Sequence, residues 1–179
     1  MKTKLFSLVA LLALSLGVAA QNSVSVDASG NWLGYANWFD PSTGAFAGGG
    51  VWGIADIKTV VDPAAGTLTL QPNFNTYADN PTDPYWVDQT TGLGAKLFEG
   101  NSYIEDNSLA GAELTFSGNI NSNTLDAAYD AVAFIKVFNA NYSVLKIATV
   151  PLNGANFEVV FTDVDPAQDA VVQYGFYVL

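Results

Sequence analysis

The chain has 179 residues, with 17 acidic and six basic side chains, and it contains no arginine, histidine or cysteine. Without histidine or cysteine it cannot build a Ser-His-Asp or Cys-His catalytic centre, a thiolate or imidazole zinc site, or a disulfide. The negative charge argues against nucleic acid as a partner, because nucleic acid is bound through cationic side chains. It also repels anionic polysaccharides, so a neutral glycan is the favoured ligand.

The N-terminal segment has the pattern of a secretory signal peptide. The basic start MKTK precedes the apolar stretch LFSLVALLALSLGV, and the small residues VAA stand before Gln21. We predict that residues 1–20 are cleaved, and that residues 21–179 form a single secreted domain without membrane insertion, found in the extracellular space or at a bacterial cell surface. Cleavage removes two of the six lysines, which leaves four against 17 acids and a net charge of −13.

Aromatic residues dominate the first predicted strand, NWLGYANWFD, at residues 31–40. In a regular strand, Trp32 and Trp38 would share one face at a separation of about 20 Å. We expect Trp32, Trp38 and the later Trp52 to serve the core more than a ligand. The secondary candidates for ligand contacts are Trp32, Tyr35 and Trp38.

The next two segments are a glycine-rich stretch and an apolar run. STGAFAGGG, residues 42–50, is expected to form a flexible loop because of its glycine content. VWGIADIKTVVD, residues 51–62, is interpreted as one strand, and GTLTLQP, residues 66–72, as another with Leu68 and Leu70 facing inward.

The loop NPTDPYWVDQTTG, residues 80–92, places two aromatic rings side by side between polar residues. A sugar ring offers an apolar face and a rim of hydroxyls, so its binding site needs an aromatic platform flanked by hydrogen-bonding groups. The two prolines reduce the entropy lost on binding. An alternative is that Trp86 folds back and plugs the end of the domain. The predicted ligand-binding residues are Tyr85, Trp86, Asn80, Asp83, Asp88 and Gln89.

The remaining chain alternates between apolar and polar residues with the period of half-buried strands. The clearest cases are ELTFSGNI (113–120), NFEVVFTD (156–163) and AVVQYGFYVL (170–179), whereas DAVAFIKVFNA (130–140) is apolar on nearly both sides. Turn residues separate these runs, and no segment sustains helical periodicity. The sequence therefore predicts an all-β fold, an antiparallel β-sandwich of jelly-roll type with about eight to ten strands.

Two adjoining segments carry a family resemblance. LAGAELTFSGNINSNTL, followed by AAYDAVAFIKVFNANYS, resembles the middle of jelly-roll carbohydrate-binding modules of families 4 and 9. Much of the rest of the chain is similar to a secreted bacterial domain associated with surface and polysaccharide-handling proteins. The first resemblance implies a sandwich that binds carbohydrate without cleaving it.

These observations favour a secreted, non-catalytic module for a neutral polysaccharide or oligosaccharide. The alternative is a structural or adhesive extracellular protein without a glycan ligand, whose aromatic residues serve packing or protein contacts. An enzyme is not expected: a glycosidase needs two carboxylates about 5–9.5 Å apart. Glu99 and Glu105 would share a strand face at a separation of about 20 Å.

A structural calcium ion is the one cofactor that the sequence suggests. DVDPAQD offers Asp163, Asp165 and Asp169, and calcium prefers such oxygen ligands. The spacing does not match that of an EF-hand loop. The oligomeric state cannot be read from the chain.

Overall fold

The computed structural model describes residues 21–179, and the predicted signal peptide lies outside these residues. Within them the chain forms eleven strands and two short helical segments. The strands are β1 (Gln21–Ser25), β2 (Leu33–Phe39), β3 (Phe46–Trp52), β4 (Thr59–Asp62), β5 (Thr67–Leu70), β6 (Leu97–Glu105), β7 (Glu113–Asn119), β8 (Ala131–Phe138), β9 (Leu145–Pro151), β10 (Asn156–Phe161) and β11 (Val171–Val178). The helical segments are α1 (Asn75–Asp79) and the 3-10 turn η1 (Asn107–Leu109).

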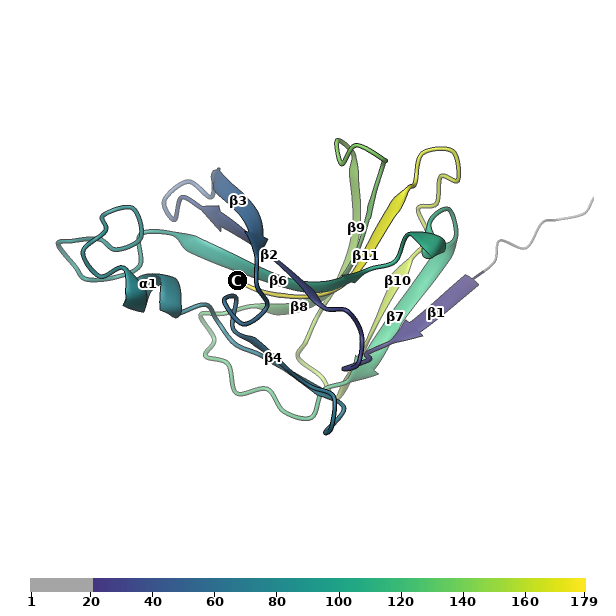
Figure 1. Ribbon diagram of the computed structural model, residues 1–179, viewed down its shortest axis with the longest axis horizontal. Helices are drawn as coiled ribbons and strands as arrows, with labels where there is room; N and C mark the ends of the chain where they lie inside the picture. The colour runs from purple at the N-terminus through teal and green to yellow at the C-terminus, as the bar shows by residue number, and fades with distance from the viewer. Residues whose placement is uncertain (1–20) are drawn as a thin grey trace, which may run out of the picture.

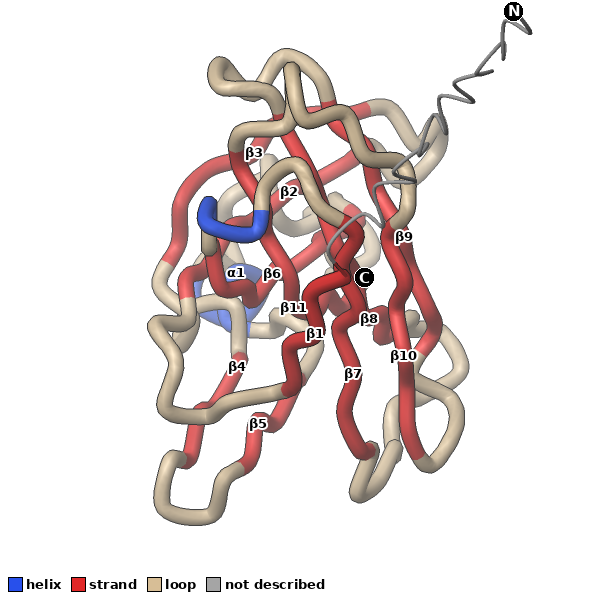
Figure 2. The backbone as a smooth tube through the Cα atoms, turned by 90° about the vertical axis from the view of Figure 1, so that its right-hand side faces the viewer, coloured by secondary structure: helices blue, strands red, loops and turns tan. Residues whose placement is uncertain are grey.

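The strands form two main sheets and a separate hairpin. The larger sheet has six strands in the order β3-β2-β6-β11-β8-β9, all antiparallel, and it curves strongly across the molecule (Figure 1). The smaller sheet has the order β1-β7-β10, with β1 parallel to β7, and Figure 2 shows it facing the viewer. The hairpin of β4 and β5 is the third sheet. The predicted all-β sandwich is therefore confirmed.

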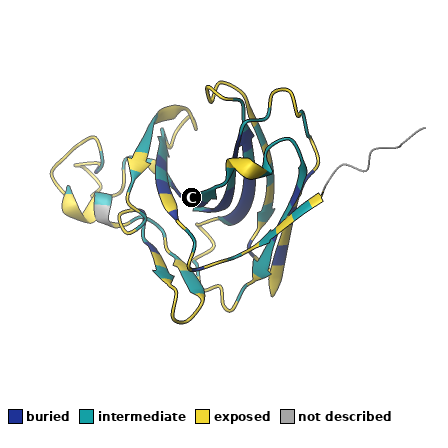
Figure 3. Ribbon diagram, turned by 45° about the vertical axis from the view of Figure 1, so that its right-hand side comes forward, coloured by how far each residue is buried: buried dark blue, intermediate teal, exposed yellow. Residues whose placement is uncertain are grey.

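The core lies between the six-stranded and the three-stranded sheets (Figure 3). Phe116 is fully buried at its centre and contacts the rings of Phe157, Tyr174 and Phe176 at centroid distances of 5.1–5.4 Å. These side chains come from β7, β10 and β11, at the alternating positions that the sequence predicted to face inward. Each alternation therefore buries one face of its strand against the other sheet.

The β4–β5 hairpin closes one end of this core. Val61, Leu68 and Leu70 are partly buried and pack against it, as expected for the two leucines. Strand β8 is buried on both faces from Val132 to Ile135, which accounts for its nearly continuous apolar sequence.

Two expectations about the segment 42–62 are wrong. Phe46–Trp52 is strand β3 and not part of a flexible loop, because its glycines let it lie close against β2. A Cβ atom at Gly48, for example, would lie 2.7 Å from the Trp38 ring. The run 51–62 is not one strand either, since a turn at residues 53–58 separates β3 from β4.

The β2–β3 turn is held by a single carboxylate. Oδ1 of Asp40 accepts hydrogen bonds from the backbone and the hydroxyl groups of both Ser42 and Thr43. These bonds, with those from Ser42 the largest contribution, lower the pKa of Asp40 from 3.8 to about 2. The turn thus fixes the register of the two strands that carry the aromatic cluster described next.

No helix within residues 21–179 is long and apolar enough to cross a membrane.

Candidate functional site

Strands β2, β3 and β6 present an aromatic surface on one face. Trp38, Trp52 and Phe98 come from neighbouring strands, and their side chains lie on the same face because Trp38 pairs with Phe98 and Gly48. The ring centroids of Trp52 lie 6.2 Å from Trp38 and 5.1 Å from Phe98. Gly48 has no side chain, so the Trp38 ring can extend across β3 toward Trp52.

The loop between α1 and β6 adds two more rings to this surface. Trp86 meets Trp38 edge to face at 5.4 Å and Trp52 at 6.5 Å with an interplanar angle of 71°. Tyr85 packs against Trp86 at 4.9 Å, and its hydroxyl accepts a 2.8 Å hydrogen bond from Nε1 of Trp38. The neighbouring Val87 is buried, which anchors this part of the loop.

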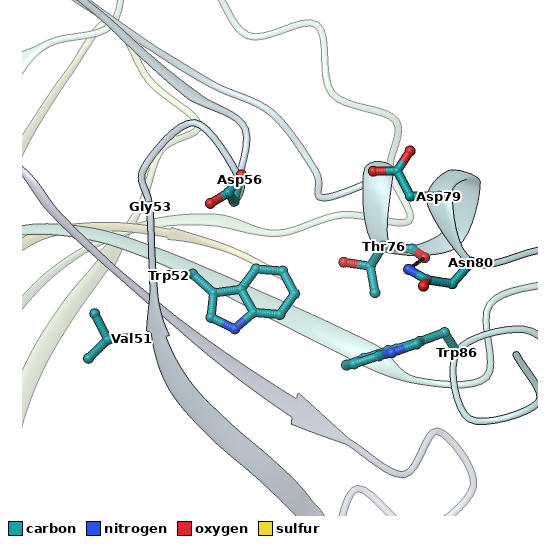
Figure 4. Close-up of a pocket in the computed structure, with 8 residues that line it drawn as sticks. All are labelled: Val51, Trp52, Gly53, Asp56, Thr76, Asp79, Asn80 and Trp86. Carbon is teal, nitrogen blue, oxygen red and sulfur yellow. Dashed lines mark hydrogen bonds between the residues drawn. The ribbon is translucent and has the colours of Figure 1, made fainter.

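Two of these rings, those of Trp52 and Trp86, border a pocket of about 500 Å³. We call it the tryptophan pocket. Figure 4 shows its walls: Trp52 on one side, Trp86 on another, and Asp56 and the residues of α1 along the upper edge. Its volume falls in the usual range for small-molecule sites, about 300–1,000 Å³. The residues that line it are Val51, Trp52, Gly53, Asp56, Thr76, Asp79, Asn80 and Trp86.

Hydrogen bonds join the three segments that form the pocket. Nδ2 of Asn73 donates to the carbonyl oxygen of Asp56, which ties the segment before α1 to the β3–β4 turn. The Tyr77 hydroxyl donates to the carbonyl oxygen of Gly92, which ties α1 to the loop. Nδ2 of Asn80 donates to the carbonyl oxygen of Thr76 and so orients its own amide. The pocket is therefore preformed.

Several polar atoms of the pocket lack protein partners. Oγ1 of Thr76 is buried and has no hydrogen-bond partner in the described part of the chain. No described side chain donates to the carboxylates of Asp56 and Asp79, both of which are exposed. Buried polar atoms in proteins almost always have a partner, so the Thr76 hydroxyl, which is closed off from the open pocket, is an exception.

The structure brings only part of the predicted ligand-binding set together. Trp86 and Asn80 line the tryptophan pocket, whereas Tyr85 supports Trp86 from outside it. Nζ of Lys96 lies 4.6 Å from the centre of the Tyr85 ring.

The other three predicted residues stabilise the loop itself. Oδ1 of Asp83 accepts from the Tyr85 backbone, and Nε2 of Gln89 donates to the carbonyl oxygens of Pro81 and Val87. Oδ1 of Asp88 accepts from the backbone of Thr90 and Thr91, and these bonds lower the pKa of Asp88.

The secondary aromatic candidates lie in three different environments. Trp32 is 7% exposed, stacks on Phe176 at 5.9 Å and donates from Nε1 to the carbonyl oxygen of Asp27, so it belongs to the core. Trp38 is half-buried beneath Trp86. Tyr35 lies on the opposite face of β2 from Trp38, because successive side chains along a strand point to opposite faces of the sheet.

That opposite face carries a polar network. Glu99 accepts 2.8 Å hydrogen bonds from Asn37 and Asn101, and Oδ1 of Asn101 accepts from Nζ of Lys136 at 2.8 Å. Burial lowers the pKa of Lys136, while Glu99 acts in the opposite direction. Because these groups bond to one another, they offer fewer free partners to a ligand than the tryptophan pocket does.

The acids suggested for calcium make contacts of their own. Asp169 accepts from Nζ of Lys146 at 2.8 Å and from the backbone of Asp165 at 2.7 Å, and Oδ1 of Asp165 accepts from Ala167. Nζ of Lys146 also donates to the carbonyl oxygen of Asp163. Within residues 21–179, no group of three or more acidic side chains is placed to hold a metal ion. Calcium stays a prediction.

Six residues that line the pocket are absent from the set predicted from the sequence, and they are Val51, Trp52, Gly53, Asp56, Thr76 and Asp79. Trp52 and Asp56 were assigned to one continuous strand, and the turn that brings them to the pocket was not expected. The polar run NTYADNP, residues 75–81, is the signal in the sequence for α1 and its two pocket residues.

A scan against protein-family models, a search of curated proteins and a search of solved structures each found no match to this chain.

Proposed function

We propose that the protein is a secreted, non-catalytic carbohydrate-binding module, and that the tryptophan pocket holds part of a glycan without negative charge. The observation that carries this proposal is the pairing of Trp52 and Trp86, set at 71° around a pocket of about 500 Å³. Indole rings offer a flat surface to the C–H face of a sugar. The side-chain oxygen atoms of Asp56, Asp79 and Asn80 lie beside them to bind hydroxyl groups.

We expect a ligand without anionic groups because the pocket and the whole protein are negatively charged. The lining contains two aspartates and no lysine, within a mature chain of four lysines and 17 acids. A sulfate or carboxylate on the sugar would meet this field without a protein cation to balance it.

Binding without cleavage is supported by the surroundings of the two carboxylates. The general acid of a glycosidase sits in an apolar environment that excludes water. Asp56 and Asp79 are both exposed.

The experiment is glycan retention, measured by affinity electrophoresis on a panel of soluble polysaccharides. Trp86→Ala should weaken retention at least about tenfold, because a central aromatic ring is often a dominant contact. Tyr129→Ala is the matched control, since this exposed aromatic side chain lies outside the pocket. If the wild-type protein is not retained by any glycan, or if Trp86→Ala is retained equally well, the proposal is wrong.

A structural or adhesive role is the second candidate, because both edge strands of the large sheet expose apolar side chains. On β3 these are Phe46 and Val51, which are 65% and 83% exposed, and on β9 they are Leu145 and Ile147. Exposed apolar groups on unpaired strand edges favour contacts with other proteins. Failure of the glycan panel would leave this role as the better account.

A further inference from the structure

We infer that the tryptophan pocket selects sugar units that carry a protonated amino group, as in polymers of glucosamine, over neutral sugars of the same shape. The inference rests on the proposed function, since it names the class of glycan that this pocket takes.

The charge of the pocket is the first reason. Asp56 and Asp79 line it, and no lysine does. The lysines of the described chain are engaged elsewhere: Lys146 is paired with Asp169, and Lys136 with Asn101. Lys58 and Lys96 lie over the rings of Phe74 and Tyr85. The protein therefore supplies no cation to the two carboxylates of the pocket, and a ligand is free to do so.

The hydrogen-bonding capacity of the pocket is the second reason. An ionised carboxylate can only accept hydrogen bonds, and an ammonium group offers three donors and no acceptor. Nδ2 of Asn80 already donates to the Thr76 carbonyl, so its Oδ1 faces the solvent-open pocket as a further acceptor. A sugar hydroxyl brings acceptor lone pairs that these oxygens cannot use, whereas an ammonium group brings none.

The aromatic walls are the third reason, and they are independent of the acids. The face of an indole ring attracts cations, and tryptophan does so more strongly than other aromatic residues. Trp52 and Trp86 meet at 71°, so a sugar stacked on one ring presents its substituents to the other.

The test compares three β-1,4-linked oligomers of equal length that differ only at carbon 2. They are built from glucosamine, N-acetylglucosamine and glucose, and binding is followed through quenching of tryptophan fluorescence. At about pH 5.5 an amine is protonated and an aspartate is ionised. We expect the glucosamine oligomer to bind about tenfold more tightly than the other two, as two exposed ion pairs and a cation–π contact allow. The difference should shrink near 1 M salt, where the Debye length is about 3 Å.

Variants locate the effect in the pocket. Asp56→Asn and Asp79→Asn should each weaken glucosamine binding about threefold to fivefold, as expected for exposed ion pairs. Binding of the glucose oligomer should weaken less than that of the glucosamine oligomer, because asparagine keeps one oxygen that accepts a hydrogen bond from a hydroxyl group. Glu158→Gln removes one negative charge from the exposed face of β10 and is the matched control, which should behave as wild type.

Each other outcome has a distinct meaning. Equal binding of the three oligomers would overturn this inference and support the proposed function. Preference for glucosamine that survives in the Asp56→Asn/Asp79→Asn double variant would assign it to the overall charge of the protein, and would overturn the inference as well. Failure of all three oligomers to bind, together with failure of the wider glycan panel, would overturn both proposals.

Discussion

The hydroxyl group of Thr76 lowers the stability of the domain. Its hydroxyl oxygen is buried without a partner, and burial of an unpaired hydroxyl costs about 1–3 kcal/mol. Valine has nearly the same shape without the hydroxyl. We therefore expect Thr76→Val to raise the free energy of unfolding by about 1 kcal/mol, measured by urea denaturation. A clear loss of stability would show that the hydroxyl has a partner, such as an ordered water.

Trp86 belongs both to the proposed glycan site and to the packing of the aromatic cluster, and one substitution changes both. A tryptophan exposed on a surface loop would change the free energy of unfolding by no more than about 1 kcal/mol on substitution by alanine, whereas a ring that plugs the end of the domain would cost several kcal/mol. In the structure its ring is half-buried and contacts Trp38, Trp52 and Tyr85. We now expect Trp86→Ala to lower the free energy of unfolding by about 1–3 kcal/mol, below the cost of emptying a fully buried tryptophan site. Binding by this variant is therefore to be measured at a temperature where circular dichroism shows it folded.

At the scale of the elements, close packing of strands depends on particular glycines. Gly175 lies in β11, and a Cβ atom there would collide with the carbonyl oxygen of Ser102 in β6. Because the obstacle is backbone, it cannot move aside as a flexible side chain could. We expect Gly175→Ala to lower the free energy of unfolding by about 3 kcal/mol, the upper range for overpacking.

Gly50 in β3 provides the matched control for Gly175. A Cβ atom there meets no atom within 4 Å, and the backbone is compatible with alanine. Gly50→Ala should raise stability by about 0.5 kcal/mol because it restricts the unfolded chain. Equal effects of the two substitutions in thermal or urea unfolding would contradict the packing argument.

The loop between β10 and β11 is joined to β9 through Lys146. Its ammonium group binds the Asp169 carboxylate and the carbonyl oxygen of Asp163, the groups that calcium would use. We expect calcium to act in this loop only if it displaces Lys146, so Lys146→Gln should gain more calcium-dependent stability than the wild type. The measurement is the Tm of both proteins in EDTA and in millimolar calcium, since a ligand of the native state raises Tm. Identical Tm values for each protein in both solutions would remove calcium from this loop.

Strands with a single buried face could be predicted from the sequence, and the elements around the site could not. In β7, β10 and β11, alternation specifies which side chains enter the core, and Phe116, Phe157 and Phe176 lie where it placed them. In β3 the glycines give no such pattern, because their role is to accept the Trp38 ring from the neighbouring strand. Only five residues form α1, too few for helical periodicity to be recognised. The tryptophan pocket joins three such segments, so its full lining depended on tertiary contacts.

At the scale of the whole molecule, burial of tyrosines makes the fold sensitive to alkaline pH. Burial raises the pKa values of Tyr103, Tyr174 and Tyr177 above 10.0, with nearby carboxylates adding to the effect. A raised pKa in the folded state means that the unfolded chain loses its tyrosine protons first. Their contribution to stability is therefore complete below pH 10.0 and is lost as the pH rises through the folded pKa values.

The two shifted lysines act in opposite directions in this range. The hydrogen bond to Asp169 raises the pKa of Lys146, so its contribution is also lost at high pH. Burial lowers the pKa of Lys136, so deprotonation at high pH removes the free-energy cost of keeping a buried positive charge. Three tyrosines and Lys146 lose their contributions in this range and only Lys136 gains, so we expect the free energy of unfolding to fall above pH 10.0 in urea denaturation. Tyr103→Phe should make the fall of the unfolding free energy with pH shallower. An unchanged slope would show that ionisation of Tyr103 does not contribute to this fall.

Strand β11, the last in chain order, lies in the middle of the six-stranded sheet. Strand β11 bonds to β6 on one side and β8 on the other, so a nascent chain that has reached residue 170 holds β3-β2-β6 and β8-β9 as two unjoined pieces. The six-stranded sheet therefore cannot be completed strand by strand during synthesis. The edges of β6 and β8 stay unpaired until the eight residues of β11 are available. The same segment from a second molecule would fit the gap equally well. Exchange of β11 between neighbouring chains is thus the misassembly to which this topology is most exposed at high concentration.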